Sequence, residues 1–510
     1  MLFNSYTFIF AFLPIALSGF FLTATIGRTI ACVWLVAVSL VFYGWWDPRF
    51  VPLLLISIAV NYGMSELMLA AQSRPRLQSA ILSCTVAANL LALVYYKYLF
   101  AILGFLSAHH VVTLPFDNVV LPLGISFFTF TQIGYLVDVK QGTARDRGLV
   151  NYATFVTFFP HLIAGPILHN REIMPQFAAT ATYRFSIRNI AIGLGIFIIG
   201  LFKKTVLADP LSAGVGEAFS HSGDLSLLAS WHGALTYTLQ LYFDFSGYSD
   251  MAIGLARMFN VTFPLNFDSP FKSPSIIEFW QRWHMTLTRF INLYLYNWVA
   301  LAIVRARTTR GLGINRKAQA TPSGFLSMIV VPTFITMSLI GIWHGAGLQF
   351  AVFGLLHSVF LVINHAWRVF RPIATRTKAG TMLATLERLA SILLTYLCAM
   401  IGMVFFRSAS VDNGMEMLAG MFGQHGFGTS FGYGSRELLW IILLYAIVWG
   451  LPNTQQLLDR YEPALGNIRP NPIGWLRWRA NLTWGILLGA GFATALLAMG
   501  GTSEFIYFQF

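Results

Sequence analysis

The sequence is poor in charged residues and in cysteine, and both shortages narrow what the protein can be. Charged residues make up 10% of the 510 residues, less than half of the share that is usual in soluble domains. Hydrophobic residues make up 56%, and the mean hydropathy is +0.65. Lipid is therefore the expected surrounding of most of the chain. The cysteines Cys32, Cys84 and Cys398 lie far apart in apolar runs, so neither a disulfide framework nor a cysteine-rich zinc site is expected.

Several motifs of common enzyme classes are also missing. The eleven histidines form no HxxxH or HExxH arrangement, and the sequence has no Walker loop. Of the common kinds of catalytic site, these absences leave a histidine-centred acid–base site without a metal. The net charge of +13 comes from basic residues that cluster between apolar runs, as cytoplasmic loops do. We therefore expect contact with membrane lipid and no nucleic-acid partner.

Apolar stretches that approach the length of a spanning helix, about 20 residues, recur along the whole chain. They are residues 7–24, 29–46, 51–71, 78–106, 187–207, 325–343, 349–367, 386–406, 437–451 and 481–499. Four more are apolar but interrupted by Pro, Gly or charge: 119–139, 150–168, 226–262 and 275–304. Irregular backbone at membrane depth needs protein or a water-filled cavity around it, so re-entrant or interfacial elements are expected there.

These stretches predict an all-α polytopic membrane protein, with one membrane-embedded domain over residues 1–510. We expect roughly 11 transmembrane helices, together with the re-entrant or interfacial helices, around a central chamber. The first 22 residues have no basic start and no convincing small-residue cleavage site. They predict a retained first membrane helix and not a signal peptide.

Ionisable residues are concentrated between Tyr242 and Arg289, in sequence that is otherwise apolar and aromatic. They are Asp244, Asp250, Arg257, Asp268, Lys272, Glu278, Arg282, His284 and Arg289. An ionised side chain at the bilayer centre costs at least about 2.5–3.5 kcal/mol, so such groups face protein or water and by default mark a functional site. The plainer alternative is internal ion pairing, which we expect for Glu278 and Arg282, one helical turn apart.

His284 is the first candidate for chemistry. Prolines before it prevent a continuous helix, and Ser273 or Ser275 can cap a new helix that begins near Ile276. On that helix Trp280 and His284 would share one face, since residues four apart are stacked. A histidine in an apolar helix can be a satisfied core residue or a catalytic one, and both interpretations stay open.

His344 is the second candidate, and it stands in plainer surroundings. It follows Trp343 at the end of an uncharged apolar run, and Gly345, Ala346 and Gly347 come directly after it. Small residues permit close approach by a helix or a ligand. A neutral imidazole with an unshifted pKa of about 6.5 can take a proton from a hydroxyl. The alternative is a histidine that is hydrogen-bonded within its own helical turn.

Six segments, in this order, resemble the membrane-bound O-acyltransferase family. They are FFPHLIAGPILH at 158–169, GLFKKTVLADPL at 200–211, FDFSGYSDMAIG at 243–254, FWQRWHMTLTRF at 279–290, WHG at 343–345 and EFIYFQF at 504–510. The sequence is most similar to the bacterial branch that includes alginate O-acetyltransferase and the D-alanyl transferase of teichoic acids. The resemblance implies a multi-pass protein of the bacterial inner membrane that transfers an acyl group from a cytoplasmic thioester towards an acceptor on the far side.

The resemblance also implies roles for particular residues. His344 matches the family's catalytic histidine, and we assign it as the general base. The position of His284 matches a second His or Asn. His284, or Arg282 beside it, would donate hydrogen bonds to the developing oxyanion. Asp250 would orient a histidine or hold the pocket, and Trp280 and Trp343 are supporting residues.

The expected donor is acetyl-CoA or another acyl thioester, with no bound cofactor, and a periplasmic acetyltransferase partner protein would complete the modification. The expected acceptor is an exopolysaccharide such as alginate or cellulose. The same chemistry on peptidoglycan, or D-alanylation of teichoic acid, is an alternative. A proton-coupled transporter, in which Asp, His and Arg form a relay, is the alternative from another class.

Overall fold

The computed structural model describes residues 1–108, 120–144, 148–371, 381–428, 435–500 and Ile506. In these residues the only β-type pairing is an isolated bridge between Pro264 and Leu465, and the all-α class is confirmed. Seven of their helices are long and apolar enough to cross a membrane: Pro48–Ala70, Pro75–Lys97, Ile187–Ser220, Met285–Thr309, Pro322–His344, Leu348–Phe370 and Met382–Arg407. Three shorter apolar helices are Phe8–Ala24, Arg28–Gly44 and Leu482–Ala498. The polytopic membrane class is thus confirmed as well.

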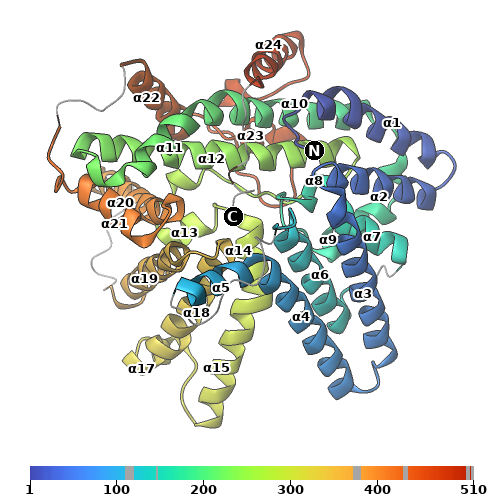
Figure 1. Ribbon diagram of the computed structural model, residues 1–510, viewed down its shortest axis with the longest axis horizontal. Coiled ribbons are helices and arrows are strands. Elements are labelled where there is room, and N and C mark those ends of the chain that lie inside the picture. The colour runs from blue at the N-terminus through green and yellow to red at the C-terminus, as the bar shows by residue number, and fades with distance from the viewer. Residues whose placement is uncertain (109–119, 145–147, 372–380, 429–434, 501–505, 507–510) are drawn as a thin grey trace. The chain divides into compact units, whose positions relative to one another are not determined.

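The chain folds into two compact units, each built from segments far apart in the sequence. Unit 1 consists of residues 1–209, 243–265 and 454–509, and unit 2 of residues 210–242 and 266–453. Helix α12 (Leu227–Met258), labelled in Figure 1, contributes its first half to unit 2 and its second half to unit 1. That the chain forms one membrane-embedded domain stays a prediction.

Unit 1 is built mostly from helices of the N-terminal half, together with α23 and α24 near the C-terminus. They are η1 (Phe8–Phe12), α1 (Leu13–Ala24), α2 (Arg28–Gly44), η2 (Pro48–Phe50), α3 (Val51–Ala70), α4 (Pro75–Lys97), α5 (Leu99–Ala108), α6 (Ile125–Lys140), α7 (Leu149–Thr157), α8 (Phe159–Leu162), α9 (Asn170–Ala178), α10 (Ile187–Phe202), η4 (Lys203–Ala208), α23 (Thr454–Leu457) and α24 (Leu482–Ala498). Helix α1 packs on α2, α4 packs on both α3 and α6, and α10 packs on α24. The predicted span 78–106 is divided, because α4 ends at Lys97 and α5 follows it.

A cluster of phenylalanines forms the centre of unit 1. Phe3, Phe8, Phe42 and Phe159 are each at most 1% exposed. Their ring centroids lie 5.0 to 6.4 Å apart in stacked, tilted and edge-on arrangements, the geometries that aromatic pairs prefer. Phe159 is the second residue of the buried irregular segment 158–170, so the cluster ties this segment to the helices around it. The predicted interruption within 150–168 is confirmed.

The predicted interruption of residues 226–262 is wrong, because α12 runs unbroken for 32 residues. Its second half lies against α10 with backbone in contact. A Cβ on Gly193 would lie 2.5 Å from the carbonyl oxygen of Gly254, and one on Gly200 would lie 2.6 Å from that of Gly247. Glycines at both crossings allow two membrane helices to meet this closely.

Unit 2 is built from the first half of α12 and from helices within residues 210–242 and 266–453. They are α11 (Ser212–Ser220), α13 (Ile276–Trp280), α14 (Met285–Ile291), η8 (Asn292–Tyr296), α15 (Asn297–Thr309), α16 (Arg316–Gln319), α17 (Pro322–Phe325), η9 (Leu326–Val330), α18 (Val331–His344), α19 (Leu348–Phe370), α20 (Met382–Arg407), α21 (Val411–Met421) and α22 (Ser435–Gly450). Helix α18 packs along α19, and α19 along α20. Glycine again permits the close contact, since a Cβ on Gly341 would lie 2.3 Å from the carbonyl oxygen of Phe350.

Candidate active site

His284 lies in a turn between two short helices of unit 2. Helix α13 begins at Ile276 with Ser275 as its N-cap, as the sequence predicted. It ends at Trp280, and α14 begins only at Met285. The expectation that Trp280 and His284 share the face of one helix is therefore wrong. His284 has a φ of 44°, a left-handed conformation that costs a non-glycine residue on the order of 1–3 kcal/mol.

The segment that begins at Asn266 holds this turn in place. The backbone N–H of Met285 donates to the carbonyl oxygen of Asn266 at 2.9 Å, and that of Asp268 donates to the carbonyl oxygen of Arg282 at 3.0 Å. The Oδ1 atom of Asn266 accepts from the backbone N–H of Thr286 at 3.2 Å and from its hydroxyl at 2.8 Å. The same Oδ1 lies 3.1 Å from Nδ1 of His284. Asn266 is 0% and His284 1% exposed, so the two residues meet in the interior of unit 2.

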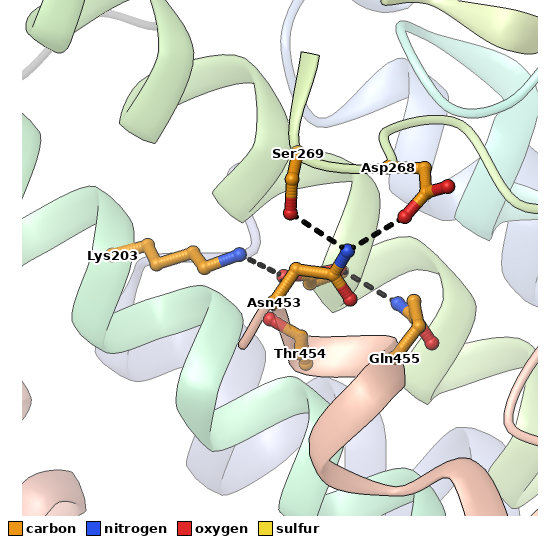
Figure 2. Close-up of polar contacts among 7 residues, drawn as sticks. Lys203, Asp268, Ser269, Asn453, Thr454 and Gln455 are labelled. Carbon is orange, nitrogen blue, oxygen red and sulfur yellow. Dashed lines mark hydrogen bonds and ion pairs between the residues drawn. The ribbon is translucent and has the colours of Figure 1, made fainter. Parts of the chain in front are cut away.

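Asn453 braces the far end of that segment. Its Nδ2 donates to Oδ1 of Asp268 at 2.9 Å and to the hydroxyl of Ser269 at 3.1 Å, as Figure 2 shows. Lys272 adds a second link, donating to the carbonyl oxygen of Leu451 at 2.7 Å. Leu451 and Asn453, just after the end of α22, thus anchor the segment that shapes the turn at His284.

Arg282 forms the ion pair that the sequence predicted. Its guanidinium contacts the carboxylate of Glu278, one helical turn earlier, and its side chain is buried. Burial of an arginine requires such compensation. A guanidinium has five N–H donors, so this pairing is compatible with a second role, and oxyanion stabilisation by Arg282 stays a prediction.

His344 is the last residue of α18 and lies within an aromatic shell. Its ring centroid lies 4.8 Å from that of Trp343, 4.9 Å from that of Phe406 and 5.9 Å from that of Phe353. The glycine after it is required, because a Cβ on Gly345 would lie 2.1 Å from the Phe350 ring. The prediction that small residues allow close packing at this point is confirmed. The surrounding rings restrict water access to His344, which is 4% exposed.

His357, on α19, belongs to the same aromatic shell. It accepts a hydrogen bond on Nδ1 from Nε1 of Trp280 at 3.3 Å. The ring of Phe353 lies 4.7 Å from His357, 5.9 Å from His344 and 6.3 Å from Trp280. Helix α19 therefore brings the end of α13 and the end of α18 to one aromatic cluster. The spacing of His344 and His357 was the only sign of this in the sequence.

Asp250 lies in unit 1, whereas both candidate histidines lie in unit 2. Its carboxylate is 2.7 Å from Nζ of Lys203 and accepts from the hydroxyl of Thr454 at 2.6 Å and the amide of Gln455 at 2.9 Å. These three partners are labelled in Figure 2. These donors come from η4 and from the start of α23. The contacts favour a supporting role for Asp250 inside unit 1, and its orienting of a histidine is an untested prediction.

A second buried ion-pair network adjoins the first, and the sequence did not predict it. Nζ of Lys204 lies 2.5 Å from Asp244 and 2.7 Å from Asp209. The backbone N–H of Ile506 donates to the other oxygen of Asp244 at 3.2 Å. Most of the segment 504–510 lies outside the described residues, but this contact places Ile506 against α12. Two adjacent lysines thus compensate the two carboxylates of α12 in unit 1.

Comparison with known proteins shows the class to which this site belongs. A sequence model of the membrane-bound O-acyltransferase family matches residues 125–309. The chain is 37% identical over 458 residues to the peptidoglycan O-acetyltransferase of Helicobacter pylori, covering 84% of this chain and 80% of that protein. It is 36% identical over 429 residues to the probable alginate O-acetylase of Azotobacter vinelandii, covering 83% and 78%. It is 26% identical over 293 residues to the teichoic acid D-alanyltransferase of Bacillus subtilis, covering 56% and 69%.

The chain belongs to the membrane-bound O-acyltransferase family. It is a multi-pass membrane enzyme that transfers an acyl group to oxygen. Its relatives imply an acyl donor and a polysaccharide or peptidoglycan acceptor. In the described residues, no three side chains of His, Cys, Asp or Glu gather as metal ligands.

Proposed function

We propose that this enzyme moves an acetyl group from acetyl-CoA in the cytoplasm towards an exopolysaccharide, such as alginate or cellulose, outside the bacterial inner membrane. The observation that carries the proposal is the position of His344, buried by three aromatic rings at the end of α18. The identity to a probable alginate O-acetylase supports this acceptor class. The similar identity to a peptidoglycan O-acetyltransferase supports peptidoglycan as the second candidate.

In the proposed reaction His344 is the general base. The ring has to begin the reaction neutral, because only a neutral imidazole can accept a proton. It takes the proton of the acceptor hydroxyl as the oxygen attacks the thioester carbonyl. The carbon–sulfur bond then breaks, and the departing thiolate receives the proton. Exclusion of water by the aromatic shell would limit wasteful hydrolysis of the thioester.

The distribution of charge in unit 2 supports entry of an anionic donor from the cytoplasm. Between Glu278 and Glu387 the sequence contains Lys and Arg but no acidic residue. Arg305, Arg310 and Arg316 are exposed in and after α15, where the positive-inside rule places the cytoplasm. Their field would attract the phosphates of acetyl-CoA. On the other side, we propose that a periplasmic acetyltransferase partner receives the acetyl group and completes its transfer to the polysaccharide.

The test uses the purified protein in lipid nanodiscs with radiolabelled acetyl-CoA, the partner protein and each acceptor in turn. His344→Ala is compared with the wild type and with His221→Ala, a variant of an exposed histidine. We expect the wild type and His221→Ala to transfer label, and His344→Ala to lose about 100-fold or more of the rate. Undiminished transfer by His344→Ala would overturn the base assignment. Turnover of a D-alanyl carrier thioester in place of acetyl-CoA would overturn the proposed donor.

A further inference from the structure

The hydrogen bonds around Asn266 determine which nitrogen of His284 carries a proton. A backbone N–H is always a donor, and that of Thr286 points at Oδ1 of Asn266 from 3.2 Å. The Asn266 atom at this position is therefore the carbonyl oxygen and not the amide nitrogen. An oxygen only accepts. Nδ1 of His284, 3.1 Å away, must therefore carry the hydrogen of this bond.

This assignment leaves the other ring nitrogen of His284 unprotonated. The ring is 1% exposed, and burial disfavours the imidazolium. A neutral imidazole with a hydrogen on Nδ1 has a lone pair on Nε2. His284 would therefore accept a hydrogen bond through Nε2, whereas the sequence had suggested a donor to the oxyanion.

The same residues fix the orientation of the ring. The left-handed backbone of His284 is maintained by two bonds between residues 266–268 and 282–285. Asn453 anchors the end of this segment through Asp268. A residue held in a costly conformation by its surroundings is typical of functional sites, where the strain serves pre-organisation.

We propose that Asn266 is a positioning residue that holds His284 as the tautomer with hydrogen on Nδ1, so that Nε2 accepts a hydrogen bond from an O–H or N–H group of the substrate. The substrate part of this inference rests on the proposed function, and it adds that the substrate bound beside His344 also reaches His284. The tautomer part rests on the hydrogen bonds alone. His284 and His344 then have different tasks: His344 takes the proton of the attacking hydroxyl, and His284 holds another donor group of the same substrate.

The tautomer can be read by nitrogen-15 NMR of nanodisc-embedded protein labelled on the histidine rings. The resonances of His284 are assigned by their absence in His284→Gln. In the wild type we expect one protonated ring nitrogen, Nδ1, and one unprotonated nitrogen, Nε2. Asn266→Ala removes the acceptor and should give a mixture of tautomers. Asn266→Asp introduces an anionic acceptor and should give a ring that is protonated on both nitrogens.

Turnover is measured on the same samples. Asn266→Ala should reduce kcat by about 10- to 100-fold, the usual effect of losing a partner that orients a functional histidine. Thr286→Val is the matched control. It removes one hydrogen bond to the same Asn266 oxygen but leaves the contact with His284, so its tautomer should match the wild type. If Thr286→Val changed the tautomer and kcat as much as Asn266→Ala does, Asn266 would act only through packing of this turn.

A wild-type His284 that is protonated on Nε2, or an Asn266→Ala variant with unchanged tautomer and turnover, would overturn the proposal. Failure of the proposed function has a different signature. In that case the wild type would show the expected tautomer but would transfer no acetyl group from acetyl-CoA.

Discussion

Replacing Gly254 by alanine is expected to destabilise unit 1, because α10 and α12 meet there backbone to backbone. A Cβ on Gly254 would lie 2.5 Å from the carbonyl oxygen of Gly193 and 2.7 Å from the backbone nitrogen of Phe197. A relaxed contact between a carbon and a carbonyl oxygen is about 3.3 Å or more. The two helices would therefore have to separate by roughly 0.8 Å. Both obstructing atoms belong to the backbone, so no rotation of a side chain can relieve the clash.

The size of the effect follows from two opposing contributions. Overpacking a well-packed site costs about 1–3 kcal/mol, and a rigid backbone obstacle places this site near the upper end. Alanine is favoured over glycine within a helix by about 1 kcal/mol. The net loss of unfolding free energy should be about 2 kcal/mol, and the Tm should fall on the order of 5 °C. Size-exclusion chromatography of heated, detergent-solubilised protein with fluorescence detection measures this change.

Gly489→Ala provides the matched control within the same unit. Gly489 lies in α24, where a Cβ would meet nothing within 4 Å. Here only the helix propensity changes, so we expect an unchanged or slightly raised Tm. Equal melting temperatures for Gly254→Ala and Gly489→Ala would refute the reasoning, because they would show that α10 and α12 do not meet at Gly254.

Two further perturbations test other parts of the structure. Gly345→Ala forces the Phe350 ring aside, since the Cβ would lie 2.1 Å from it. We expect kcat for acyl transfer to fall at least about tenfold, with a change in Tm of at most a few degrees. An unaltered kcat would contradict the packing at His344. Asp250→Ala leaves the half-buried Lys203 without its ion pair and should cost about 3 kcal/mol, the lower end for a broken buried pair. Lys203→Met combined with Asp250→Ala should cost less than either change alone. Additive losses of Tm in that double-mutant cycle would show that the two side chains do not interact.

The class of fold could be predicted from the sequence, but the continuity of α12 could not. Spanning length and low charge are local properties, and they identify the apolar helices well. The acidic residues within 226–262 suggested a break because their partners were unknown. Those partners, Lys203 and Lys204, lie some forty residues earlier in the chain. The sequence pattern of one segment does not show that its charges are neutralised by residues of another segment.

In the candidate site, too, features set by nearby residues could be predicted, whereas features set by distant residues could not. The cap at Ser275, the pair of Glu278 with Arg282, and the need for a small residue after His344 all depend on neighbours within a few residues, and each prediction is confirmed. The break at His284 depends on hydrogen bonds with residues near Asn266, eighteen positions earlier. The predicted helix was therefore extended beyond its actual end, and the His284 ring was expected on a helical face that does not exist.

The two adjacent lysines of η4 have a consequence for how the chain enters the membrane. Alone in lipid, Lys203 and Lys204 on one helix and Asp244 and Asp250 on the other would each carry the cost of an uncompensated charge. Paired, the four side chains compensate one another. We therefore expect α10 and η4 to stay at the site of membrane insertion until α12 has been synthesised, so that the two helices enter the bilayer together. The ion pairs thus couple the order of synthesis to the register in which these two helices pack.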